Sequence, residues 1–131
     1  MRTRLSLTTE DANAMMTASL DAARAAGRAV SIAVVDDAGV LIDFRRMDGA
    51  RGYTVDLATR KARASALVGV STAMIEAMSK NRPASPEMTV GQGGLPAMAN
   101  ADCVGGIGVS GAKPEEDEAI AKAGLAALPP R

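Results

Sequence analysis

Lys61 occupies a position that is unusual for an ammonium group. It shares the apolar face of a predicted helix with Leu57, Ala64 and Val68. Most lysines in such positions lay the stem on apolar surface and bring the charge to water. If the ammonium group is buried instead, loss of hydration lowers its pKa, and the lysine can act as a base or hold an anion. The sequence leaves both interpretations open.

Asp117 is a second candidate for moving a proton. It shares a face with Ile120, Ala121 and Gly124 near the start of the last predicted helix, so its carboxylate should point towards the sheet and the loop at 110–111. A carboxylate in a first turn commonly accepts hydrogen bonds from backbone amides. It can also act as an acid, a base or a group that orients a ligand. Lys61 and Asp117 are therefore the candidate catalytic residues.

Arg46 and Asp48 leave the second predicted strand together, just before the helix that carries Lys61. They can form the rim of a pocket in which the Arg46 guanidinium would hold a ligand carboxylate through two parallel hydrogen bonds. Asp48 followed by Gly49 is also an ordinary turn-forming pair. With both alternatives open, Arg46 and Asp48 are candidate ligand-binding residues.

Two glycine-containing segments add backbone groups that can bind an anion without a charged side chain. One holds Gly94 and Pro96, and the other holds Ser110 and Gly111. Glycine is equally common where a sheet needs room for a neighbouring backbone. These four residues complete the candidate ligand-binding set.

Histidine is absent from the sequence. Its absence removes the commonest general base near neutral pH, the usual haem and zinc ligand, and any Ser-His or Cys-His nucleophile. The single cysteine, Cys103, lies in an apolar run and cannot close an internal disulfide. The eight methionines suit core packing better than metal binding. We expect no metal site.

The composition limits the classes of partner. The 131 residues fit one domain, spanning 1–131. Fifteen basic residues balance fifteen acidic ones, and Phe44 and Tyr53 are the only aromatic residues, so the usual electrostatic and stacking surfaces for nucleic acid are missing. No apolar stretch has the length of a signal segment or a membrane span. We expect a cytoplasmic protein that binds neither nucleic acid nor membrane.

Hydrophobic spacing and turn-forming residues predict the order helix, hairpin, two helices, hairpin, helix. Thr8 and Asp11 resemble a capping box at the start of the first helix, and Pro114 with three acidic residues begins the last. Without a repeating strand-helix-strand pattern, an antiparallel sheet covered by helices is favoured. The segments expected between these helices are strands over 30–35, 40–44, 95–99 and 103–109, helices over 54–68 and 71–80, and a loop over 81–96.

Gly106, Gly108 and Gly111 have the spacing of a dinucleotide-binding loop. Such a loop follows a strand and needs an acidic residue on a second strand about 20 positions later. Here only a helix-like segment follows, and the glycines interrupt the apolar run 103–109. We interpret them as strand positions at which two backbones approach closely.

Four stretches of the sequence resemble successive motifs of the GlcG/HbpS family, also called the haem-degrading domain family and related to the C-terminal domain of PduO, and the resemblance extends over nearly the whole chain. They are SIAVVDDAGVLIDFRRMDGA, DLATRKARASAL, GGLP and GGIGVSGAKPEEDEAIAKAGLAAL. The resemblance implies a profilin-like α/β (α+β) fold, in which a five-stranded antiparallel sheet is flanked by helices. It also implies assembly into a homo-oligomer, which agrees with the apolar character of the Ala- and Met-rich helices.

For function, the resemblance implies haem-binding sensors in some members and a place beside small-molecule catabolism in others. Iron would have to be held here by Tyr53, Cys103, a methionine or a lysine, so haem is possible, but we expect no cofactor. The first hypothesis is a binding protein for a small organic acid or tetrapyrrole-like ligand, with its pocket between the sheet, helix 54–68 and loop 81–96.

The alternative hypothesis is a cofactor-free isomerase, lyase or hydrolase. In it, Arg46 holds a carboxylate, Lys61 or Asp117 moves a proton, and amides near Gly94 or Gly111 stabilise an oxyanion.

Overall fold

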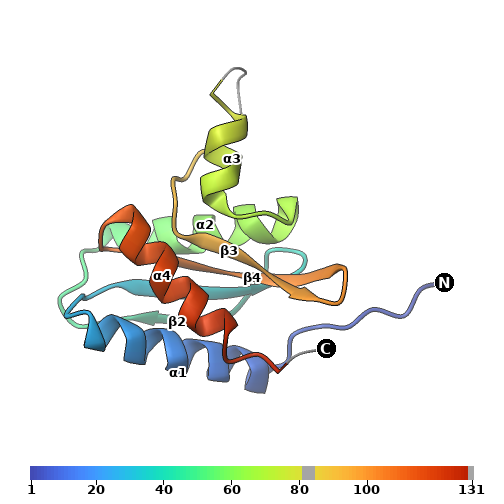
Figure 1. The fold of residues 1–131 in the computed structure, drawn as a ribbon, viewed down its shortest axis with the longest axis horizontal. Coiled ribbons are helices and arrows are strands. Elements are labelled where there is room, and N and C mark those ends of the chain that lie inside the picture. Colours follow the sequence, from blue (N-terminus) through green and yellow to red (C-terminus); the bar gives the residue numbers. More distant parts are fainter. Residues whose placement is uncertain (81–84, 130–131) are drawn as a thin grey trace.

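The structure is a computed structural model that describes residues 1–80 and 85–129. Within those ranges the chain forms four helices and four strands in the expected order (Figure 1). The elements are α1 (Thr9–Ala25), β1 (Ser31–Asp36), β2 (Leu41–Arg46), α2 (Tyr53–Val68), α3 (Thr72–Met78), β3 (Gly94–Ala99), β4 (Asp102–Ser110) and α4 (Pro114–Leu125).

The strands form one antiparallel sheet in the order β2-β1-β4-β3. The α+β class and antiparallel pairing are confirmed, but the expectation of five strands is wrong for the described chain, which has four. The described part of the segment between α3 and β3 cannot easily extend the sheet. Pro86 lacks an amide hydrogen, and Gly91 and Gly93 have φ values of 78° and 133°, far from those of a strand.

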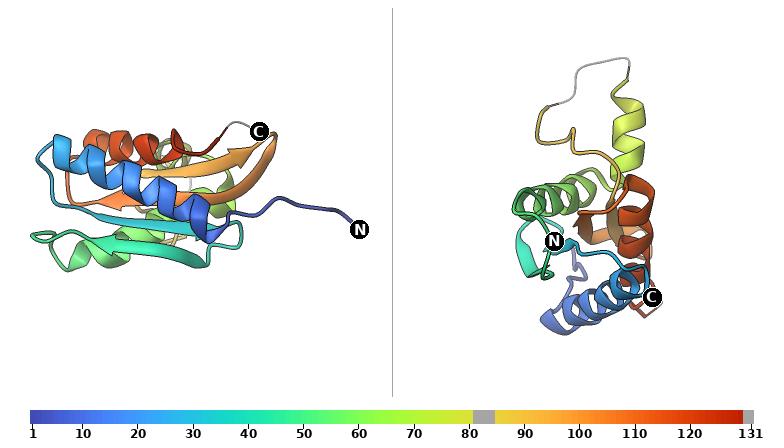
Figure 2. Two further views of the ribbon diagram at one scale, coloured as in Figure 1. Left: turned by 90° about the horizontal axis from the view of Figure 1, so that it is seen from below. Right: turned by 90° about the vertical axis from the view of Figure 1, so that its left-hand side faces the viewer.

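Helices cover both faces of the sheet (Figure 2). α1 and α4 pack together on one face, over a core that includes Ile32, Val34 and Ile107. α2 lies on the opposite face, where its alanines meet Ala33 and Val35. The alternation along β1 therefore sends successive side chains to two separate cores.

The glycines of β4 let α2 approach the sheet closely. A Cβ added to Gly106 would lie 2.5 Å from the carbonyl oxygen of Ala62, and one added to Gly108 would overlap the backbone of Ala58 and Ala62. The interpretation of this run as a site of close backbone contact is confirmed. Because Gly106 and Gly108 lie inside an antiparallel strand, the dinucleotide-loop geometry is not formed.

The sequence signals at the helix ends also agree with the structure. Thr8 and Asp11 form a capping box, with the Thr8 amide donating to the Asp11 carboxylate at 2.9 Å. Ser71 accepts a hydrogen bond from the Met74 amide at the start of α3. α3 ends at Met78, two residues earlier than the sequence predicts. The expected loop over 81–96 gives way to β3 at Gly94, and its first four positions lie outside the described residues.

Among the helices that the structure describes, none combines the length and the apolar character needed to cross a membrane.

Candidate functional site

Lys61 and Asp117 meet inside the protein. The Lys61 Nζ lies 3.3 Å from Asp117 Oδ2, and the two side chains are 5% and 4% exposed. The same ammonium group donates to the carbonyl oxygen of Val109 at 2.9 Å. The ion pair therefore joins α2, β4 and α4, and Lys61 is buried rather than extended to water.

Asp117 also uses its second carboxylate oxygen. Oδ1 accepts a hydrogen bond from the backbone amide of Ala112 at 2.9 Å, which fixes the loop between β4 and α4. Asp117 thus satisfies a backbone amide, as one interpretation of the sequence expected, and it also holds the charge of Lys61. No buried side-chain nitrogen or oxygen in the described ranges lacks a hydrogen-bond partner.

Burial shifts both groups towards their neutral forms. Loss of hydration lowers the pKa of Lys61 from 10.5, and the carboxylate of Asp117 offsets only part of this effect. Loss of hydration likewise raises the pKa of Asp117 from 3.8, against the opposing effects of the Ala112 amide and Lys61. Such a pair is costly to keep charged, although each partner compensates the other.

Gly93 borders this ion pair from β3's side. It has a φ of 133°, and an added Cβ would lie 2.9 Å from Lys61 Nζ and 2.6 Å from the Val109 carbonyl oxygen. Its own carbonyl accepts from the Val109 amide at 3.0 Å. The missing side chain at Gly93 leaves the space in which Lys61 and Val109 meet.

The neighbouring backbone candidates lie close to the same region. Gly94 is buried, and its amide donates to Thr72 Oγ1 at 2.9 Å. Pro96 is half-buried and lies opposite Gly106 in the sheet. Ser110 is buried and pairs with β1, whereas Gly111 is exposed with a φ of 132°. These positions gather around β3 and the end of β4, but the Gly94 amide already has a partner.

Arg46 and Asp48 lie elsewhere, in an open pocket at the end of β2. The pocket has a volume of about 330 Å³, and both side chains are exposed. Lys61 and Asp117 are not among its lining residues. The lining consists of Leu20, Arg24, Arg45, Arg46, Met47 and Asp48.

A second open pocket lies between helix α2 and the segment that precedes β3. The sequence predicted a pocket that also borders the sheet, but no strand residue of the described chain lines this one. Its volume is about 370 Å³. Arg60 pairs there with Asp56, four residues earlier in α2, at 3.8 Å, and donates to the Pro86 carbonyl oxygen at 2.9 Å. The lining consists of Asp56, Arg60, Arg63, Ala64, Leu67, Glu87 and Met88.

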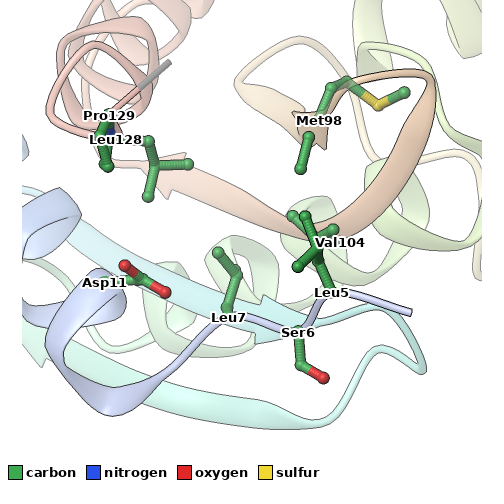
Figure 3. A pocket seen from close by; sticks show the side chains of 9 residues that line it. Leu5, Ser6, Leu7, Asp11, Met98, Val104, Leu128 and Pro129 are labelled. Carbon is green, nitrogen blue, oxygen red and sulfur yellow. The ribbon is translucent and has the colours of Figure 1, made fainter. Parts of the chain in front are cut away.

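A third hollow is too small for a typical ligand. It lies between the N-terminal segment and the β3-β4 hairpin, and Leu5, Leu7, Met98 and Val104 supply apolar walls (Figure 3). Its volume is about 50 Å³, whereas small-molecule pockets have roughly 300–1,000 Å³.

The pocket linings include residues that the sequence did not single out for binding. Arg63 and Leu67 lie on the same exposed side of α2 as Arg60, a helical spacing that the sequence does contain. Arg24 joins Arg45 and Arg46 only through the packing of α1 beside β2, so no local pattern reveals that grouping. The described residues contain no cluster of three or more cysteine, aspartate or glutamate side chains placed to hold a metal ion.

A family model described as "Haem degrading protein HbpS-like" matches residues 7–126. The chain belongs to this HbpS-like family. The sequence resemblance to the GlcG/HbpS family is thereby confirmed. Protein GlcG of Escherichia coli strain K12 is 35% identical over 114 residues, which cover 84% of this chain and 85% of GlcG.

Solved structures agree with this membership. The structure of a double mutant of HbpS from Streptomyces reticuli is 34% identical, with a TM-score of 0.92, and the match covers 98% of this chain and 91% of that chain. Protein ORFY of Klebsiella pneumoniae is 25% identical, with a TM-score of 0.88 and coverage of 96% and 93%. The PduOC:Heme complex is 22% identical with a TM-score of 0.88, covers 95% of this chain and 96% of that chain, and shows likeness of fold.

Proposed function

We propose that this HbpS-like protein is a cytoplasmic homo-oligomer that binds an organic acid or tetrapyrrole-like ligand in the pocket beside α2. The observation that carries the proposal is the lining of this pocket, in which apolar Ala64, Leu67 and Met88 lie beside two arginines. The lining also holds Asp56, which pairs with Arg60, and Glu87, so Arg63 is the arginine left for a ligand. Such a lining suits a ligand with an apolar body and at least one carboxylate. The volume of about 370 Å³ is enough for a small ligand or for part of a larger one.

Arg63 is the residue most available to a ligand carboxylate. It is exposed, and it has no ion pair among the residues that the structure describes. Its neighbour Arg60 is already engaged by Asp56 and Pro86. A free guanidinium can bind a carboxylate through two parallel hydrogen bonds, so Arg63 would orient the acid group.

The pocket is better suited to hold the propionate groups of haem than to ligate its iron. Relatives support a tetrapyrrole, because one similar fold was solved as the PduOC:Heme complex and the family description names haem degradation. Arg63 would hold a propionate, and the Met88 thioether is the one lining side chain of a type that ligates haem iron. Bound haem would supply redox chemistry, but a lone thioether without histidine is a weak iron site. We therefore propose that the protein needs no cofactor.

Hemin titration tests the proposal directly. Binding should produce a shifted Soret band and raise the melting temperature, because a ligand of the native state stabilises it. Arg63→Ala should weaken binding about 10-fold through the lost charge-assisted hydrogen bonds. Arg46→Ala, in the other large pocket, is the matched control and should bind like the parent. If hemin and a series of amphipathic organic acids all leave the melting temperature unchanged, the proposal is wrong.

Self-association is proposed from a group of exposed apolar side chains around α3. Leu67 and Val68 end α2, and Met74 and Met78 lie on α3, which projects from the body of the protein (Figure 1). Exposed apolar side chains on neighbouring elements commonly form contacts between proteins. We assign this apolar group, Leu67, Val68, Met74 and Met78, to the contact between copies of the chain.

The alternative of a cofactor-free enzyme using Arg46, Lys61 and Asp117 is not favoured. Lys61 and Asp117 have partners inside the protein, and neither lines the two large pockets. Arg46 lines a pocket that they do not reach. The ion pair therefore supports the fold without a ligand.

A further inference from the structure

Three arginines from two separate elements line the pocket at the end of β2. Arg24 comes from the last turn of α1, while Arg45 and Arg46 are the last two residues of β2. Both elements end at the same end of the molecule (Figure 1). The apolar side chains of Leu20 and Met47 complete the lining beside these guanidinium groups.

Two of the three positive charges are uncompensated. Arg24 pairs with Asp21 at 3.5 Å on the surface, but Arg45 and Arg46 make no ion pair with any residue in the described ranges. Asp48 is the one acidic residue in the lining. Because the whole chain carries equal numbers of basic and acidic residues, this local excess of positive charge is not a general property of its surface.

The arginine pocket is distinct from the pocket beside α2. The two linings have no residue in common. Ile32, opposite Arg45 in the sheet, belongs to the core under α1 and α4, whereas α2 covers the other face. Exposed arginines often lie over apolar surface without binding anything, yet such arginines are usually scattered or paired with acids. Here they gather around a hollow of about 330 Å³.

We propose that the arginine pocket binds a compact polyanion that carries two or more carboxylate or phosphate groups. Each free guanidinium can take one anionic group through a planar pair of hydrogen bonds. A ligand with two such groups would engage Arg45, which lies on the α1 face of the sheet, together with Arg24. Arg46, the next residue of the strand, starts from the opposite face and would add positive charge from the edge of the sheet. A monoanion can use only one of these contacts, so the site should discriminate by charge number. This site is independent of the ligand proposed for the α2 pocket.

Calorimetric titration of the full chain tests this inference with defined probes. Citrate represents the polycarboxylates, pyrophosphate represents the phosphates, and acetate is the monoanion control, all at about 0.15 M ionic strength. At least one polyanion should bind saturably with one molecule per chain, and acetate should bind at least about 10-fold more weakly. Preference between citrate and pyrophosphate then identifies the acid class.

Variants separate this site from non-specific charge attraction. Arg45→Ala and Arg24→Ala should each weaken polyanion binding about 10-fold, and Arg45→Lys should bind more tightly than Arg45→Ala because charge returns without the planar geometry. Arg63→Ala should leave polyanion binding unchanged while it weakens hemin binding, so failures at the two pockets are distinguishable. Circular dichroism checks that each variant is folded. Absence of saturable binding by both polyanions, or unchanged binding in Arg45→Ala, would overturn the inference.

Discussion

The Lys61 ammonium group lies 3.3 Å from the Asp117 carboxylate, with both side chains almost completely buried. The two residues come from helices on opposite faces of the sheet, α2 and α4. Their contact at the end of β4 therefore fixes the position of both helices relative to the strand. We regard this pair as the polar centre of the fold rather than as a catalytic dyad.

Removing one member of the Lys61–Asp117 pair should lower the free energy of unfolding more than removing both. Lys61→Met leaves the Asp117 carboxylate buried without its counter-charge, which typically destabilises a protein by about 3–5 kcal/mol. The double variant Lys61→Met with Asp117→Leu removes both charges and should recover most of that loss. Urea unfolding measures the free energy of each variant. Equal losses of unfolding free energy in the single and double variants would contradict a coupled pair. Arg60→Met is the control: it breaks an exposed pair and should lower the free energy of unfolding by at most about 1 kcal/mol.

The same pair predicts how stability depends on pH. The pKa of Asp117 is raised above 3.8, so the native state holds this proton longer, and its contribution to the free energy of unfolding falls as pH rises through the raised pKa. The pKa of Lys61 is lowered below 10.5, so its contribution rises as pH increases from the lowered pKa towards 10.5. The pair therefore contributes least to the free energy of unfolding at pH values between the raised pKa of Asp117 and the lowered pKa of Lys61.

The test compares the parent protein with the double variant across the pH range. The difference in unfolding free energy between the two proteins removes the titration of all other groups. It should pass through a minimum between the raised pKa of Asp117 and the lowered pKa of Lys61, and increase on both sides. A maximum in that interval would mean that attraction between the charges outweighs the cost of burial.

Gly93→Ala tests the close packing around the ion pair. The added methyl group would lie 2.6 Å from the Val109 carbonyl oxygen, and the residue would have to adopt a φ of 133°. We expect a loss of about 3 kcal/mol from overpacking and backbone strain together. Gly69→Ala is a matched control, because Gly69 has a φ of 82° but no atom within 4 Å of an added Cβ. It should cost only about 1 kcal/mol, as judged by thermal or urea unfolding.

The fold was largely predictable because its signals are local. The Thr8 cap, Pro114 with the acidic first turn of α4, and the glycines of β4 each specify structure within a few positions. The count of five strands came from family resemblance, whereas the sequence itself indicated the four that are described. For the number of strands, the pattern of apolar and turn-forming residues was therefore a better guide than the resemblance to the family.

The site was only partly predictable because it depends on distant contacts. Lys61 and Asp117 were each identified as candidates from the sequence. They are 56 positions apart, so no local pattern indicates that they contact each other. Arg46 and Asp48 were named, yet the packing of α1 that brings Arg24 to the same pocket has no signature in either segment. Pockets arise from tertiary packing, so composition and spacing reveal their parts and not their grouping.

The apolar group at α3 predicts that self-association can be removed by charge. Met74 and Met78 are 51% and 47% exposed, so glutamate at both positions can be solvated in a free chain. At an interface between copies, the same carboxylates would lose hydration without a partner and would prevent assembly. Met74→Glu with Met78→Glu should therefore give a monomer in light scattering at micromolar concentration while the parent forms an oligomer. Met98→Glu is the matched control, because Met98 is 46% exposed on β3 and lies outside this group. It should leave the oligomer intact, and a parent protein that is itself monomeric would remove the assignment of this surface.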